Sequence, residues 1–400
     1  EADKIMLKLT GQKLSTYIFP ASSSIRTEEQ EQQLRQTEIC QPAMLTADIA
    51  MYRLLRAHGL QPDFVVGHSL GEYAALVAAE VLSFEDALKA VSLRGIEMAS
   101  VSVTDPGLMA SVQAHWHTIE PILKEINGYV IAANKNSYTQ TVISGETQAV
   151  KDAIALFKAK GISARLIPVS AAFHSKIVAP AAKPLKKGLQ KLMFHSPKIK
   201  ILSNVTGTYY PEGEDAADQI IELLAKQVAS PVEFITNIET LYAEGARIFI
   251  EVGPKRALTY MTQNILSERP ALVCSSNHPK KGDLYTFNEL LANLLVMGVP
   301  VRFPLTKPER IQQPSSSRTL LDPSLEFFVR TLTDKELVKL AADPNFRSYL
   351  QCYGHTIRDF IKQSFKSLQH YFHPQLTSPQ IQRPVLSEAT LLNNSTRPVI

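Results

Sequence analysis

Residues 63–79 have the sequence Asp-Phe-Val-Val-Gly-His-Ser-Leu-Gly-Glu-Tyr-Ala-Ala-Leu-Val-Ala-Ala. The short apolar run at 63–66 is typical of a buried strand, and the Ala- and Leu-rich run that follows favours a helix. Between them, Gly67-x-Ser69-x-Gly71 is the pattern of a sharp strand-to-helix turn that exposes a serine hydroxyl. We expect the two glycines to relieve crowding in this turn and the helix N-terminus to direct N–H groups at an oxyanion. The stretch predicts a nucleophilic Ser69 and acyl transfer through a serine ester.

The second feature is an arginine on an apolar helix face. Ser83 predicts the N-cap of a helix in which Arg94 shares one face with Ala87, Val91 and Met98. A buried guanidinium needs a partner, because an unpaired buried charge is costly. The spacing leaves two alternatives open. In the first, Arg94 forms an internal salt bridge, or its aliphatic chain is buried while the guanidinium reaches water. In the second, the guanidinium binds a substrate carboxylate through two hydrogen bonds.

The third feature is His174, in the segment Ala-Ala-Phe-His-Ser at 171–175, which follows a strand-like run at 164–169. A serine nucleophile needs a general base whose pKa lies near neutral, and histidine is the usual one. The chain has 10 histidines, so a candidate base was to be expected somewhere. A single histidine is more often structural than catalytic.

Together these features resemble the acyltransferases that load malonyl groups onto acyl carrier protein. These are the malonyl-CoA:carrier-protein transacylases of fatty acid synthesis and the acyltransferase domains of polyketide synthases. Further matches follow in the family's order, so the resemblance covers roughly residues 1 to 295. They are Gln41-Pro42-Ala43, Ser203-Asn204-Val205-Thr206-Gly207, Gln227 with Ser230-Pro231-Val232, and Glu251-Val252-Gly253-Pro254.

The resemblance implies ping-pong chemistry. Ser69 would attack the thioester carbonyl of malonyl-CoA, with His174 as the base and the backbone N–H of Leu70 stabilising the oxyanion. The phosphopantetheine thiol of an acyl carrier protein would then attack the acyl-serine. In this family a backbone carbonyl orients the histidine, and Gln227 stands at the matching position. The resemblance implies no permanently bound cofactor and no metal.

The resemblance also implies how the acyl group is recognised. Arg94 would hold the free carboxylate of the malonyl group, so the resemblance favours the second alternative for this residue. We expect malonyl to be strongly preferred over acetyl, because a site built around a buried polar contact rejects analogues that lack it. Phe173 would narrow the pocket where an α-methyl group would lie, although Ala171 replaces the histidine usual in malonyl-selective members. The other residues implied are Gln41 in substrate binding, with His68 and Asn204 in support.

The order of strands and helices predicts an α/β fold with a parallel sheet in a hydrolase-like core. Residues 1–106 and 171–295 would form this large subdomain. Residues 107–170 have the order strand–helix–strand–strand–helix–strand, which predicts an inserted ferredoxin-like small subdomain. The second and fourth of these strands are expected at 129–133 and 164–169. We expect the active site in the cleft between them, with Ser69 on one side and His174 on the segment that returns from the insertion.

The ends of the chain suggest a multidomain context. Residues 296–373 predict a linker with helices, and 374–400 predict a flexible interdomain connector. Such a region favours a synthase with a neighbouring ketosynthase and other domains over a free-standing transacylase. The family opens with a strand and a Gly-Gln-Gly loop that supplies a second oxyanion donor. Since the sequence has no such loop, we expect an N-terminally truncated piece of a longer polypeptide.

The composition is typical of a soluble intracellular enzyme. The 400 residues carry a net charge of +4 and include 3 cysteines without metal-ligand or disulfide spacing. The longest apolar stretches are too short to span a bilayer, and no secretory leader opens the chain. We therefore expect a cytoplasmic protein that binds neither membrane nor nucleic acid.

Two other functions remain open from the sequence. The first is a serine esterase or thioesterase with an α/β-hydrolase core, which needs an acid to orient its histidine. Asp152 lies between Ser69 and His174 in the sequence, but on a predicted helix of the small subdomain. The second is a non-catalytic docking or scaffold fragment of a synthase.

Overall fold

The computed structural model describes residues 1–20, 27–101, 103–303 and, by backbone alone, 397–399. These residues divide into two compact units. Glu1–Arg53, Gln61–Asn277 and the C-terminal strand belong to the first unit, and, of the described residues, 54–60 and 278–303 belong to the second. Apart from 296–303 and 397–399, the predicted linker at 296–373 and connector at 374–400 lie outside the described residues.

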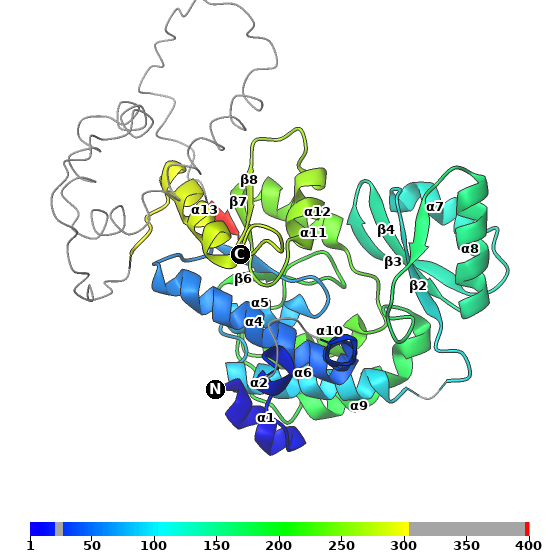
Figure 1. Ribbon diagram of the computed structural model, residues 1–400, viewed down its shortest axis with the longest axis horizontal. Coiled ribbons are helices and arrows are strands. Elements are labelled where there is room, and N and C mark those ends of the chain that lie inside the picture. Colours follow the sequence, from blue (N-terminus) through cyan, green and yellow to red (C-terminus); the bar gives the residue numbers. More distant parts are fainter. Residues whose placement is uncertain (21–26, 102, 304–396, 400) are drawn as a thin grey trace, which may run out of the picture. The chain divides into compact units, whose positions relative to one another are not determined.

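The first unit contains a five-stranded parallel sheet (Figure 1). Its order is β6-β1-β9-β7-β8, and every neighbouring pair is parallel. The strands are β1 (Phe64–Val66), β6 (Lys200–Leu202), β7 (Ala246–Glu251), β8 (Leu272–Ser275) and β9 (Arg397–Val399). The predicted α/β fold with a parallel sheet is confirmed. Two of the strands, β1 and β6, lead into the segments that carry Ser69 and Asn204, and the carboxyl ends of parallel strands meet at one edge of a sheet.

Helices cover this sheet because their apolar faces need burial. One large core gathers fully buried side chains from different helices, among them Leu76, Leu88, Leu185 and Leu224; burying a leucine stabilises a fold by about 1.5–3 kcal/mol. The helices of this unit are α1 (Ala2–Thr10), α2 (Ser15–Ile18), α3 (Glu28–Arg35), α4 (Thr37–Ala57, which runs on into the second unit), α5 (Gly71–Ala78), α6 (Phe84–Ala99), η1 (Lys176–Ala181), α9 (Ala182–Leu189), α10 (Ala216–Gln227), α11 (Phe234–Ala243) and α12 (Ala257–Ile265).

The second unit, as far as it is described, is built around helix α13 (Asp283–Val296). The His58 ring packs edge-on against Phe287, and its Nδ1 lies 2.8 Å from the Arg302 carbonyl oxygen. Over the described residues of both units, no helix is long and apolar enough to cross a membrane.

A smaller antiparallel sheet follows α6 in the chain. Its elements are β2 (Leu108–Val112), α7 (Trp116–Leu123), β3 (Val130–Ser137), β4 (Gln140–Gly145), α8 (Thr147–Ala159) and β5 (Ala164–Leu166), with the strand order β3-β4-β2-β5. Both helices pack on the same face of this sheet, where they bury Ile119, Val150 and Phe157 (Figure 1). The six elements occur in the order that the sequence predicts.

Two strands of this sheet differ in length from the prediction. β3 continues beyond residue 133 to Ser137, because it stays paired with β4 as far as Ser137 opposite Gln140. β5 ends at Leu166 instead of residue 169, since Pro168 has no N–H to continue the ladder. The first difference matters for the site, because the extra length of β3 carries Asn136 toward the large sheet.

Candidate active site

Ser69 lies in the turn between β1 and α5, and its backbone is strained. Its φ of 54° lies in the left-handed region that residues other than glycine rarely adopt. Two amide side chains hold the turn in place. The Ser69 N–H donates to Asn204 Oδ1 at 2.6 Å, and Gln227 Nε2 donates to the Ser69 carbonyl at 2.8 Å. The strained conformation therefore has hydrogen bonds on both sides of the serine.

The two glycines of the turn differ in what they contribute. A Cβ on Gly67 would come within 2.0 Å of the Gly71 carbonyl carbon and 2.1 Å of the Glu72 nitrogen. A Cβ on Gly71 would meet nothing within 4 Å. The prediction that both glycines relieve crowding is correct for Gly67 and wrong for Gly71. The reason is that Gly71 is the first residue of helix α5, and a Cβ placed on it would point into open space.

The structure brings Ser69 and His174 together. Ser69 Oγ lies 2.7 Å from His174 Nε2, and the His174 backbone also has a positive φ, 57°. His174 Nδ1 lies 3.1 Å from the carbonyl oxygens of both Gln227 and Ser230. Carbonyl oxygens only accept hydrogen bonds, so Nδ1 carries the proton and Nε2 is free to accept from the serine hydroxyl.

The protonation state of His174 suits a base. Burial of the ring, together with smaller effects of the positive charges of Arg94 and His68, lowers the pKa of His174 to about 3, against the hydrogen bonds to the Gln227 and Ser230 carbonyls, which raise it. The imidazole is therefore neutral at physiological pH, and its Nε2 lone pair faces the serine. A neutral ring with its lone pair on the serine is the form that can accept the Ser69 proton, but its pKa lies well below the near-neutral value expected from the sequence, because the ring is fully desolvated.

A carboxylate does not orient this histidine in the described part of the chain. The acceptors at Nδ1 are the two backbone carbonyls. Asp152 lies on α8, where it accepts a hydrogen bond from Gln148 Nε2 at 2.8 Å. The Ser–His–acid arrangement of esterases is thus not formed by the residue that the sequence offered for it.

Arg94 lies in the same network. Helix α6 begins at the predicted cap, with Ser83 accepting from the Asp86 N–H, and it places Arg94 in the interior at 3 % exposure. Nη1 donates to Gln41 Oε1 at 2.8 Å, and Nη2 donates to Gln227 Oε1 at 3.2 Å and Ser69 Oγ at 3.3 Å.

The partners of Arg94 bear on the alternatives left open by the sequence. All of them are neutral, and no ion pair to this guanidinium occurs among the described residues. Its Nε is buried without a hydrogen-bond partner. A side chain so deeply buried does not snorkel, and burial lowers the pKa of Arg94. A cation that is fixed by neutral groups and retains an unused donor is suited to an anionic ligand.

The remaining predicted residues surround this pair in different ways. His68 Nε2 lies 2.8 Å from Asn136 Oδ1 on β3, so it connects the turn to the small sheet. Phe173 is half-buried and packs against Met109 and Val142 of that sheet. Leu70 is the N-cap of α5, and no described residue accepts a hydrogen bond from its backbone N–H.

Sequence reasoning missed three residues of this network. Ser230 supplies the second carbonyl at His174, and Asn136 contacts His68. The third, Glu72, is fully buried and bonded to Asn204, Tyr210 and Gln227. The only signal for Glu72 was a charged residue in the first turn of an otherwise apolar helix. A carbonyl contact such as that of Ser230 leaves no trace in side-chain identity.

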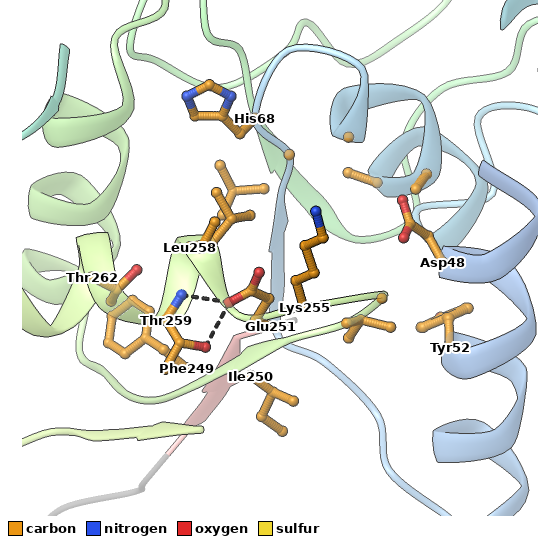
Figure 2. Close-up of a pocket in the computed structure, with 18 of the residues that line it drawn as sticks. Asp48, Tyr52, His68, Phe249, Ile250, Glu251, Lys255, Leu258, Thr259 and Thr262 are labelled. Carbon is orange, nitrogen blue, oxygen red and sulfur yellow. Dashed lines mark hydrogen bonds between the residues drawn. The ribbon is translucent and has the colours of Figure 1, made fainter. Parts of the chain in front are cut away.

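A cavity of about 330 Å³ opens beside the turn, but neither Ser69 nor His174 lines it (Figure 2). Its wall includes His68 from the turn and Asp48 from α4. Glu251 lies at the end of β7 and accepts from the N–H and hydroxyl of Thr259 (Figure 2). Burial and the neighbouring Glu251 raise the pKa of Asp48 to about 7. In the described ranges, no three His, Cys, Asp or Glu side chains are grouped so that they could hold a metal ion.

Comparisons with known proteins place the chain among acyltransferases. The profile of the acyl transferase domain family matches residues 10–301. A malonyl CoA-acyl carrier protein transacylase of Bacillus subtilis is 38% identical over 260 residues, which are 63% of this chain and 78% of that protein. A spectinabilin polyketide synthase system protein of Streptomyces orinoci is 34% identical over 296 residues, which are 70% of this chain; the chain spans only 13% of that protein. The solved acyltransferase domain from the second module of the salinomycin polyketide synthase has a TM-score of 0.66 and 31% identity, covering 76% of this chain and 68% of the other.

Proposed function

Since the chain belongs to the acyl transferase domain family, we propose that it transfers a malonyl group from CoA to the phosphopantetheine thiol of an acyl carrier protein. The observation that carries this proposal is the 2.7 Å contact between Ser69 Oγ and a neutral His174, with the unused donor of Arg94 in the same buried network. Malonyl-CoA is the donor substrate, and the chain needs no resident cofactor for this chemistry.

In the first half-reaction Ser69 attacks the thioester carbonyl. His174 Nε2 takes the hydroxyl proton as the C–O bond forms, and it gives the proton to the CoA sulfur as the C–S bond breaks. The free backbone N–H of Leu70 donates to the oxyanion of the tetrahedral intermediate. The carbonyls of Gln227 and Ser230 hold the Nδ1 proton and so fix the ring orientation during both transfers.

In the second half-reaction the carrier-protein thiol attacks the malonyl-serine ester. His174 takes the thiol proton as the new C–S bond forms and returns a proton to Ser69 as the C–O bond breaks. The same base thus serves both directions, and the enzyme ends in its starting state. This sequence is the ping-pong pattern that the Ser–His pair supports without an acid partner.

Arg94 is the residue that selects a dicarboxylic acyl group. Its guanidinium would pair with the free carboxylate of malonyl, while Gln41 keeps it in place from the side away from Ser69. An acetyl group would leave this buried cation unpaired, which is the kind of loss that gives strong discrimination. Phe173 would narrow the site where an α-methyl group of methylmalonyl would lie.

The domain organisation is part of the proposal. The strand order β3-β4-β2-β5 with two helices on one face supports a ferredoxin-like subdomain at 107–170, inserted into a hydrolase-like large subdomain at 1–106 and 171–295. The match to 13% of a polyketide synthase system protein of Streptomyces orinoci supports a place among the domains of a larger synthase. His68 and Asn204 would act as supports of the turn.

The test is transfer to a carrier protein. Malonyl-CoA and an acyl carrier protein bearing phosphopantetheine are incubated with the protein, and the mass of the carrier is followed over time. We expect a gain of one malonyl group on the carrier, which a Ser69→Ala variant does not produce. Release of free malonate and CoA with no malonyl-carrier would instead support a thioesterase and contradict the proposal.

A further inference from the structure

Glu72 is a fully buried carboxyl group that takes no direct part in the reaction described above. It lies in the first turn of α5, three residues after Ser69, and is 0 % exposed. Its Oε1 accepts from the Asn204 N–H and from the Tyr210 hydroxyl, both at 2.9 Å. Its Oε2 accepts from the Gln227 side-chain amide. Both oxygens of the carboxyl group are therefore used as acceptors.

The partners of Glu72 are the residues that fix the reacting groups. Asn204 accepts from the Ser69 N–H and donates to the Gly67 carbonyl at 2.8 Å, so it holds the turn. Gln227 contacts the nucleophile, the cation and the base. Its Nε2 donates to the Ser69 carbonyl, and its Oε1 accepts from Arg94. Its backbone carbonyl oxygen lies 3.1 Å from His174 Nδ1. One carboxyl group thus connects the holders of the nucleophile, the base and the cation.

The hydrogen bonds indicate that this group acts as a carboxylate. Two of the three described contacts, the Asn204 N–H and the Gln227 NH₂, can only donate, so they favour the ionised form; among these contacts a protonated carboxyl could donate only to the Tyr210 hydroxyl. The start of helix α5 and the nearby Arg94 both favour negative charge here. A lone buried carboxylate is costly, so one with three donors arranged around it is a built feature of the site.

We propose that Glu72 is a positioning residue. Its carboxylate fixes the orientations of Asn204 and Gln227, and these two residues in turn fix the relative positions of Ser69, His174 and Arg94. The inference rests on the proposed acyltransferase function. It predicts that Glu72 contributes to the rate of acylation and little to the binding of malonyl-CoA, because Arg94 keeps its separate bond to Gln41.

The test is the isosteric change Glu72→Gln. The glutamine can be oriented in two ways. In one its NH₂ group faces the Gln227 amide, and in the other it faces the Asn204 N–H and the Tyr210 hydroxyl. In either orientation an N–H donor of the new side chain faces another N–H donor. We expect serine acylation at saturating malonyl-CoA to slow by about 10²-fold, the cost of small misplacements of reacting groups, with KM changed by less than about threefold.

A matched control separates positioning from stability. Glu239→Gln removes a half-buried carboxylate that accepts two hydrogen bonds from Arg269 at 2.6 Å and one from the Tyr138 hydroxyl, none of them shared with the Glu72 network. We expect it to lower the thermal midpoint while leaving acylation at the wild-type rate. An equal loss of rate in both variants, or a raised KM at an unchanged saturating rate for Glu72→Gln, would overturn the proposal.

The pH profile supplies a readout that a purely structural role would not change. Burial raises the pKa of Glu72 to about 7, against the opposing effects of its hydrogen bonds and Arg94. The other titratable groups facing it are Tyr73 and Tyr210, whose pKa values burial raises above their usual range and which stay neutral. Protonation would remove the acceptor of Gln227, so we expect wild-type acylation to fall on the acid side near pH 7. The slow residual rate of Glu72→Gln should lack that fall; its persistence would count against the proposal.

A second variant covers the case in which Glu72→Gln does not fold. Tyr210→Phe removes one of the two donors at Oε1 and leaves Gln227 untouched. We expect a folded protein whose acylation slows at least threefold at saturating malonyl-CoA, and a wild-type rate would contradict the role of Glu72. Failure of the wild-type protein itself to form a malonyl-serine would instead refute the proposed function, so the two failures are distinguishable.

Discussion

At the scale of single residues, the site depends on two backbones in an unfavourable conformation. Ser69 and His174 both have positive φ, and only two other non-glycine residues in the described part of the chain do, Glu80 and Lys255. Such strain costs on the order of 1–3 kcal/mol per residue and persists only where surrounding contacts enforce it. Here Asn204 and Gln227 provide those contacts for the serine.

The role of Arg94 gives a prediction about selectivity. We expect Arg94→Ala to lower malonyl loading of the serine by about 10²-fold or more while acetyl loading changes little, because only malonyl has a carboxylate to pair with. Arg94→Lys should also load poorly, since an ammonium group cannot replace the planar fork. Loading rates with the two acyl-CoAs check this, and a parallel loss for both would contradict the assignment.

The buried histidine gives a prediction about stability and pH. The pKa of His174 is about 3 in the folded protein and about 6.5 in an unfolded chain, so between these values the unfolded chain binds a proton that the folded one does not. The free energy of unfolding should therefore fall as the pH decreases from 6.5 toward 3. Relative to His174→Gln, the wild type should lose about 1.4 kcal/mol more per pH unit in this window. Denaturant unfolding at pH 7.5 and 5.5 measures the difference; identical losses would contradict the buried, neutral ring.

The sequence alone predicted the residues whose side-chain type indicates their chemical role. Ser69, His174 and Arg94 were found because nucleophile, base and cation each need a particular side chain, and Gln227 was found through the family resemblance. Glu72 and Ser230 were not, because their roles depend on which groups the fold brings beside them. A buried carboxylate and a backbone carbonyl have no local sequence signature of that role.

At the scale of elements, the strand–turn–helix at 63–79 determines where the serine lies. Gly67 is needed there for space and not for backbone freedom, since its φ is not in the left-handed region. The contacts a Cβ would make are with the backbone of Gly71 and Glu72, which cannot move without shifting the start of α5. The turn therefore has a steric requirement for glycine at position 67 but not at position 71.

That requirement predicts opposite effects for two Gly→Ala changes. We expect Gly67→Ala to destabilise the fold by about 3 kcal/mol or more, through forced backbone movement. Gly71→Ala should be neutral or stabilising by up to about 1 kcal/mol, because alanine is the better residue within a helix and its Cβ meets nothing. Thermal unfolding of both variants tests the pair, and similar midpoints would show that the turn is not crowded at Gly67.

The element pattern was predictable where periodicity and turn residues agreed. The helix capped by Ser83 and the six elements from Leu108 to Leu166 follow from such signals. The extension of β3 to Ser137 did not, because it depends on pairing with β4 and not on the apolar alternation of its own residues. That extension positions Asn136 against His68, so tertiary pairing completed a part of the site that the local sequence left out.

At the scale of the molecule, the site joins two layers of the first unit. The segments after β1 and β6 of the parallel sheet supply Ser69 and Asn204, and the end of helix α10 supplies Gln227. The segment returning from the antiparallel sheet supplies His174. His68 and Asn136 bond across the two sheets beside the nucleophile. The order of the chain predicted this arrangement in outline, since an insertion between nucleophile and base must return to the sheet to bring them together.

The central claim is that Ser69 carries the malonyl group, and intact mass measures it directly. The protein is incubated separately with malonyl-, methylmalonyl- and acetyl-CoA beside a Ser69→Ala control. The account predicts a covalent adduct of one malonyl group that the control lacks, less adduct from methylmalonyl-CoA, and least from acetyl-CoA. The absence of an adduct from all three in the folded protein, or an equal adduct in the Ser69→Ala control, would contradict it.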